Sequence, residues 1–90
     1  MPQYVIERTL PGAGDLSDEQ VHGIAAASNV VLDAMPGVQW QESYVTQDKL
    51  YCVYLAPDAD SIRDHAVRGG FPADSVELVR RRIDPTTGGR

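Results

Sequence analysis

Hydrophobic positions along the first third of the chain follow two different spacings in turn. Residues 3–9 mix β-branched and aromatic side chains with charged ones, which is typical of a strand, and the Pro- and Gly-containing loop 10–14 ends it. Hydrophobic and small residues then recur every third or fourth position, which predicts a helix over about residues 18–34 with one face toward a core. Ser17 and Gln20 match the capping box that starts such a helix.

The middle of the chain has the pattern of an antiparallel hairpin. Residues 38–46 and 49–56 are rich in β-branched and aromatic side chains, and only two residues separate them. If Thr46 pairs with Lys49, one face carries Trp40, Glu42, Tyr44, Tyr51, Val53 and Leu55, and the other carries Val45, Leu50, Cys52, Tyr54 and Ala56. Both faces are then substantially apolar. Helices can cover one of them, and a second copy of the chain is the simplest cover for the other, so we expect a homodimer.

A second, shorter helix is predicted to end at Gly69-Gly70, with Phe71 placed against its last turn. Residues 75–84 form the fourth predicted strand, and residues 85–90 have the composition of a disordered tail. The resulting order of elements predicts a single α+β domain over residues 1–84. Its fold would be ferredoxin-like, βαββαβ, with a four-stranded antiparallel sheet and two helices on one face, of the dimeric α/β-barrel type.

Composition narrows the class of protein. Hydrophobic residues make up 42% and charged residues 23% of the chain, as in ordinary globular proteins. We expect no membrane association and a cytoplasmic location, because there is no long apolar run and no signal-peptide pattern at the start. A net charge of −5 argues against a nucleic-acid partner, despite the basic cluster Arg80–Arg82. Cys52 is the only cysteine, which excludes an internal disulfide and a Cys-x-x-Cys copper site; we interpret it as a small buried hydrophobe.

Polar side chains at apolar positions are the candidate functional residues. His65 lies near the inward direction of the second helix, where the pattern fits either a partly buried histidine bonded to a carbonyl or a ligand or acid–base group. His22 falls on the solvent side of the first helix. Glu42 is flanked by two aromatic residues on its predicted strand face, so it needs a cation, a metal ion or solvent as a partner. Glu7 in the first strand raises the same question. No Ser-His-Asp or Cys-His order is recognisable.

Four stretches of the chain resemble one family of small bacterial proteins. They are Val-Gln-Trp-Gln-Glu-Ser-Tyr-Val at 38–45, Lys-Leu-Tyr-Cys-Val-Tyr at 49–54, Ile-Arg-Asp-His-Ala at 62–66 and Gly-Phe-Pro-Ala-Asp at 70–74. The family is known as domain of unknown function 4242 and is described as nickel-binding. The resemblance extends from Tyr4 to about Pro85. It implies a ferredoxin-like dimer and, for at least some members, nickel binding.

Nickel prefers imidazole and oxygen donors. We therefore expect a divalent-metal site with nickel as cofactor, built from His65, Glu42 and Glu7 and completed by water or a second subunit. The function implied by the resemblance is non-enzymatic handling or sensing of metal. The alternative is a dimeric α/β-barrel enzyme or small-ligand binder that uses the cavity between sheet and helices. In that case His65, Tyr44 and Glu42 are the acid–base candidates, and Tyr44 is the candidate contact to a bound cofactor or ligand.

Overall fold

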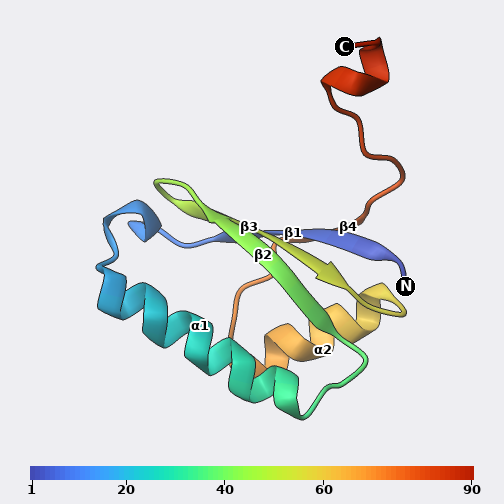
Figure 1. Cartoon of the computed structure of the whole chain (residues 1–90). Helices are drawn as coiled ribbons and strands as arrows, with labels where there is room; N and C mark the ends of the chain where they lie inside the picture. The colour runs from blue at the N-terminus through green and yellow to red at the C-terminus, as the bar shows by residue number, and fades with distance from the viewer.

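The protein is a four-stranded antiparallel sheet with both helices on one of its faces (Figure 1). The computed structural model describes residues 1–90. The strands are β1 (Gln3–Thr9), β2 (Gln39–Val45), β3 (Lys49–Leu55) and β4 (Ser75–Leu78), and the helices are α1 (Asp18–Asp33) and α2 (Ala59–Gly69). The strand order β2-β3-β1-β4 places β1 between β3 and β4. This arrangement confirms the predicted ferredoxin-like α+β fold.

Side chains and one glycine set the ends of the two helices. The Ser17 hydroxyl accepts a hydrogen bond from the Gln20 backbone N–H at 3.1 Å, and the Gln20 side chain accepts one from the Ser17 N–H at 2.9 Å, which confirms the capping box. Asp58 caps α2 by accepting from the Ser61 N–H at 2.8 Å. The same helix ends at Gly70, whose φ of 69° lies in the left-handed region that favours glycine.

The hairpin has the predicted register at its turn and departs from it further along β2. At the turn the backbone N–H of Thr46 donates to the Lys49 carbonyl at 2.9 Å, as predicted. A β-bulge between Trp40 and Glu42 then adds one residue to β2. Because an extra residue reverses the alternation of side chains, Trp40 lies on the helix-covered face while Glu42 lies on the outer face. The prediction that these two residues share a face was therefore wrong.

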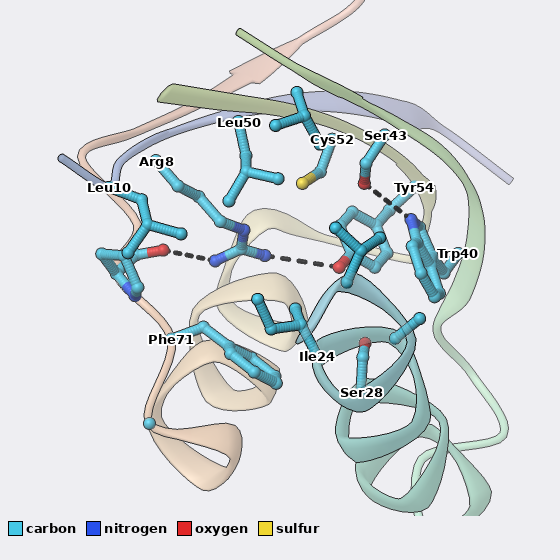
Figure 2. A pocket seen from close by; sticks show the side chains of 15 residues that line it. Arg8, Leu10, Ile24, Ser28, Trp40, Ser43, Leu50, Cys52, Tyr54 and Phe71 are labelled. Atoms are coloured by element: carbon cyan, nitrogen blue, oxygen red, sulfur yellow. Dashed lines mark hydrogen bonds between the residues drawn. The ribbon is translucent and has the colours of Figure 1, made fainter. Parts of the chain in front are cut away.

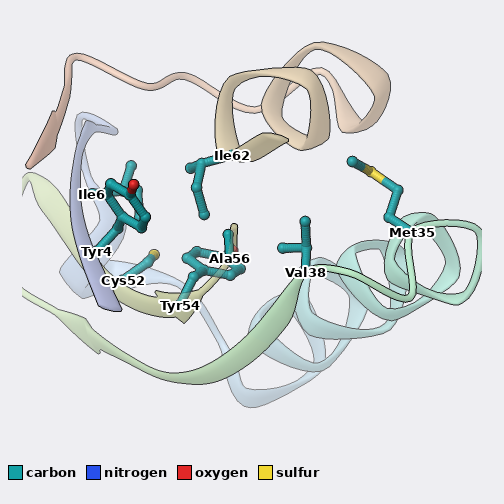
Figure 3. Close-up of a cluster of buried hydrophobic side chains, with 8 residues drawn as sticks. All are labelled: Tyr4, Ile6, Met35, Val38, Cys52, Tyr54, Ala56 and Ile62. Carbon is teal, nitrogen blue, oxygen red and sulfur yellow. The ribbon is translucent and has the colours of Figure 1, made fainter. Parts of the chain in front are cut away.

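The packed core fills one end of the space between the helices and the sheet (Figure 3). Ile6 of β1 and Ile62 of α2 are fully buried there. The cluster consists of Tyr4, Ile6, Met35, Val38, Cys52, Tyr54, Ala56 and Ile62. Val31 and Leu32, from the second half of α1, pack against it, whereas no residue from the first half of that helix does. The other end of the same space is consequently left for a cavity.

The fourth strand is shorter than predicted. Val79 makes the last contact of the ladder by donating its N–H to the Gln3 carbonyl at 2.9 Å. Because β1 begins at Gln3, the chain beyond Val79 has no neighbouring strand to pair with. The exposed residues 80–82 therefore follow the sheet instead of extending it. Pro85–Gly88 forms a short 3-10 helix that projects away from the sheet (Figure 1). Neither α1 nor α2 has the length and hydropathy of a membrane-spanning helix.

Candidate functional site

A cavity of about 330 Å³ lies between α1 and the sheet, beside the packed core (Figure 2). Its volume falls in the range of small-molecule sites, roughly 300–1,000 Å³. Ten of its fifteen lining residues are hydrophobic. The lining consists of Arg8, Leu10, Val21, Ile24, Ala25, Ser28, Trp40, Ser43, Val45, Leu50, Cys52, Tyr54, Gly70, Phe71 and Pro72. The lining comes from β1, β2, β3, α1 and the turn after α2, and most of its side chains are apolar.

Two small side chains near the middle of α1 leave room for the cavity. Ala25 and Ser28 line the cavity at the middle of that helix. Their neighbours Val21 and Ile24 also line it, yet they remain 39% and 37% exposed. Val45, on the facing strand β2, is 44% exposed. The rim of the cavity between α1 and β2 is therefore open to solvent.

Arg8 is the one charged side chain in the lining. It follows the buried residues Tyr4 and Ile6 at two-residue spacing along β1, so it shares their face, points toward the helices and is only 4% exposed. One terminal nitrogen of its guanidinium donates to the Pro72 carbonyl, and the other donates to the Tyr54 hydroxyl at 3.4 Å (Figure 2). Arg8 takes part in none of the ion pairs of the chain. Its charge is therefore buried without a carboxylate partner.

Aromatic rings provide much of the immediate surroundings of that charge. The Arg8 Cζ lies 5.9 Å from the centroid of the Tyr54 ring and 5.8 Å from that of Phe71, within the range of cation–π attraction. The pKa of the Asp74 carboxyl is lowered chiefly by hydrogen bonds from Thr9. The positive charge of Arg8 also lowers it, but is the smallest of the causes. The Asp74 carboxylate accepts the Thr9 backbone N–H and forms no ion pair with Arg8.

His65 lies behind the cavity wall. The side chain is completely buried, its Nε2 is 3.4 Å from the Ser28 hydroxyl, and its Nδ1 has no hydrogen-bond partner. The ring packs against Tyr54 and Phe71 at centroid distances of 5.4 and 5.5 Å. Burial, and secondarily the charge of Arg8, holds the pKa of His65 below its ordinary value. The imidazole is therefore neutral at pH 7.

The structure does not bring the predicted metal ligands together. His65 is enclosed between α2 and the sheet. Glu42 is exposed on the outer face, where it accepts a hydrogen bond from the Tyr44 hydroxyl at 2.7 Å. Glu7 is half-buried on β1 and forms an ion pair with Lys49. No three His, Cys, Asp or Glu side chains of the chain are grouped so that they could hold a metal ion.

The surroundings of His65 do not suit a divalent cation either. The charge of Arg8 disfavours the imidazolium form of His65, and the same field would repel a metal ion placed on the imidazole. Two aromatic rings, Tyr54 and Phe71, pack against the imidazole where further ligands would be needed. The residues of one chain therefore do not fit nickel at this histidine. Tyr44, the predicted contact to a bound cofactor, is 56% exposed and does not line the cavity.

Arg8 and Trp40 are cavity residues that sequence reasoning missed. A signal for Arg8 was available, because it follows Tyr4 and Ile6 at the two-residue spacing that places all three on one strand face. Trp40 had no such signal, since no glycine or proline marks the bulge that turns it inward. Its indole N–H donates to the Ser43 hydroxyl at 2.9 Å, and both residues line the cavity.

Known proteins share both the sequence pattern and the fold. The family described as "Nickel responsive protein SCO4226-like" matches residues 4–79. The crystal structure of SCO4226 from Streptomyces coelicolor A3(2) is similar to this chain with a TM-score of 0.76 and 18% sequence identity, over 90% of this chain and 99% of that chain. No curated protein sequence matches at a significant level. The match over most of the domain confirms the resemblance stated from the sequence, and the chain belongs to the SCO4226-like family of nickel responsive proteins.

Proposed function

We propose that the chain is a small-molecule-binding protein and that the cavity between α1 and the sheet is its binding site. The observation that supports this most strongly is a largely apolar cavity of about 330 Å³ with a single buried cation and a partly open rim. Small-molecule sites usually combine such an apolar lining with a few polar groups that orient the ligand. Here Arg8 and the Tyr54 hydroxyl are those groups.

Binding is favoured over catalysis by the positions of the acid–base candidates. Tyr44 and Glu42 contact each other on the outer face of the sheet, and neither lines the cavity. His65 does not line the cavity. Its Nε2 lies near the hydroxyl of Ser28, which does line it. A bound molecule would therefore meet apolar walls and hydrogen-bond donors, and no base positioned to take a proton from it.

The proposal is tested with a neutral apolar fluorophore, N-phenyl-1-naphthylamine, whose emission rises when it leaves water. Wild type should bind it saturably. Ala25→Phe should fill the cavity and weaken binding by about tenfold or more, because Ala25 is one of the lining residues. The matched control is Ala26→Phe, which makes the same change at an exposed position of the same helix that is not in the lining. Absence of binding to wild type, or equal binding to both variants, would contradict the proposal.

We propose nickel binding by a non-enzymatic protein as a second candidate, because the family is described as nickel responsive. Since His65 is enclosed and close to a positive charge, we expect nickel to use exposed donors, completed by water or a second subunit. His22, on the surface of α1, is the other imidazole of the chain.

Elemental analysis of tag-free protein, followed by calorimetric titration with nickel, tests this candidate. Replacement of the exposed histidine in His22→Ala should weaken nickel binding. Replacement of the buried histidine in His65→Ala should leave it unchanged, provided that thermal unfolding shows a folded protein. The reverse result would show that the buried imidazole is a ligand, and absence of nickel binding to wild type would remove the candidate.

A further inference from the structure

We propose that the ligand of the cavity is an apolar molecule carrying a single carboxylate, and that this carboxylate binds the guanidinium of Arg8. The inference rests on the proposed function of the cavity as a binding site. Arg8 is 4% exposed and has no ionic partner. An unpaired charge is costly to keep in a protein interior. Arg8 holds such a charge at the wall of an accessible cavity, where an anionic ligand would supply the missing partner.

The guanidinium retains donors for this purpose. Of its five N–H groups, one is donated to the Pro72 carbonyl and one to the Tyr54 hydroxyl, which leaves three. Figure 2 shows the guanidinium at the centre of the space between the sheet and the helices, with Phe71 below it. A planar fork of N–H groups matches the two oxygens of a carboxylate, and hydrogen bonds between charged groups are stronger than neutral ones.

Tyr54 supplies a second polar contact at the same place. Burial raises the pKa of its phenol above the ordinary value, so the hydroxyl keeps its proton at neutral pH. Because its oxygen accepts a hydrogen bond from Arg8, its own proton can be donated to a ligand oxygen nearby. The imidazole of His65 does not add to the charge, because its lowered pKa keeps it neutral at pH 7.

The charge balance favours one negative charge on the ligand. Arg8 is the only cation in the lining, and the whole chain carries a net charge of −5. A doubly charged phosphate would leave one charge uncompensated in a mainly apolar space. A monocarboxylate leaves none.

The cavity also limits the size of the ligand. At the packing density of protein interiors, about 330 Å³ accommodates on the order of fifteen non-hydrogen atoms. With the carboxylate at Arg8, the rest of the molecule would extend between Ile24 and Leu50 toward Trp40, all of them lining residues. Octanoate has a suitable size and an apolar tail.

The test compares three probes of equal chain length, octanoate, octanamide and octylammonium, by displacement of N-phenyl-1-naphthylamine at neutral pH. Octanoate should bind wild type at least about tenfold more tightly than octanamide, and octylammonium should bind most weakly, because only the first pairs with Arg8. In Arg8→Met the difference between octanoate and octanamide should disappear, while the neutral fluorophore still binds. Arg63→Met removes an exposed arginine outside the cavity and should change nothing.

The outcomes distinguish failure of the carboxylate assignment from failure of the cavity as a binding site. If octanoate and octanamide bind wild type equally and Ala25→Phe blocks both, the cavity is a binding site and the assignment of a carboxylate is overturned. If neither probe nor the fluorophore binds wild type, both proposals fail. The wild-type comparison needs no variant at all, so it decides the question even if Arg8→Met does not fold. Arg8→Lys, which keeps the charge but loses the planar fork, should then retain part of the preference for octanoate.

Discussion

Arg8 and His65 are two buried polar side chains that lie close to the same pair of aromatic rings. Tyr54 and Phe71 contact both: their rings lie within 6 Å of the Arg8 Cζ and of the His65 ring centroid. The guanidinium of Arg8 is charged and the imidazole of His65 is neutral. The charge of Arg8 helps to keep the imidazole neutral because it lowers the pKa of His65. A core selected for stability alone would contain neither group without a full set of partners. Their presence beside a cavity therefore supports a role in binding.

His65 should make stability depend on pH. Its folded-state pKa is below the ordinary value of about 6.5, so the unfolded chain binds the proton more readily. The contribution of His65 to the free energy of unfolding is therefore complete above about pH 6.5 and is lost as the pH falls toward the folded-state pKa. Urea denaturation at about pH 7.5 and about pH 5 measures this loss.

The matched variants are His65→Phe, which removes the buried imidazole, and His22→Phe, which makes the same change at an exposed position. His65→Phe should lose part of the stability difference between the two pH values, and His22→Phe should retain it. An undiminished pH dependence in His65→Phe would contradict this prediction and assign the effect to the carboxylates.

At the scale of elements, the end of α2 shapes one wall of the cavity. Gly70 turns the chain in a left-handed conformation, and Phe71 folds back so that its N–H donates to the Ala66 carbonyl at 2.8 Å. The Phe71 ring lies so close to Gly69 that a Cβ added there would be 2.1 Å from a ring carbon. This contact confirms the prediction that Phe71 packs on the last turn of the helix. The absence of a side chain at Gly69 therefore allows the Phe71 ring to take its position in the cavity wall.

Gly69→Ala should displace the Phe71 ring and reduce both stability and ligand binding. We expect a loss of about 1–3 kcal/mol in the free energy of unfolding, the usual cost of forcing extra atoms into a packed site. The control is Gly23→Ala on α1, where a new Cβ meets nothing within 4 Å. That change should stabilise the protein by about 0.5–1 kcal/mol, because alanine is the better helix former. Thermal or urea unfolding of both variants measures the difference, and equal effects would contradict this account of the wall.

The sequence pattern was sufficient for the elements and their order but not for the site. Helix ends followed from local chemistry, as at Ser17 and Gln20, because capping depends on residues three positions apart. The site depends on contacts between distant residues. Whether Glu42 faces a partner was not decidable without knowing about the bulge beside it, and whether His65 meets a carboxylate depends on how α2 lies on the sheet. Arg8 was accessible to the same alternation argument that placed its neighbours.

At the scale of the whole molecule, the two faces of the sheet have different covers. The helices enclose one face, with packed core at one end and the cavity at the other (Figures 2 and 3). On the outer face Tyr51, Val53 and Leu55 of β3 are half-buried, and Tyr44 of β2 is 56% exposed. These apolar side chains are the part of the predicted homodimer argument that survives after Trp40 is reassigned to the inner face.

A homodimer formed through the outer face remains our prediction. Light scattering at micromolar concentration should give twice the chain mass of 9.8 kDa. Val53→Asp, near the centre of the outer face, should shift the protein to monomer, because a buried carboxylate would have no partner. Val30→Asp makes the same change at a position on α1 that is 70% exposed and should leave the mass unchanged. A wild-type mass equal to that of one chain would contradict the prediction.

The most direct test of the central claim is a two-dimensional ¹H–¹⁵N NMR titration that resolves the Arg8 Nε–H and the Trp40 indole N–H. Saturation with octanoate should shift the Arg8 signal strongly and move the signals of Trp40 and of cavity residues such as Ser28 and Phe71. Octanamide should shift Trp40 but leave Arg8 nearly unchanged. An unchanged Arg8 signal in the presence of saturating octanoate, or shifts confined to the outer face around Tyr44, would contradict the account.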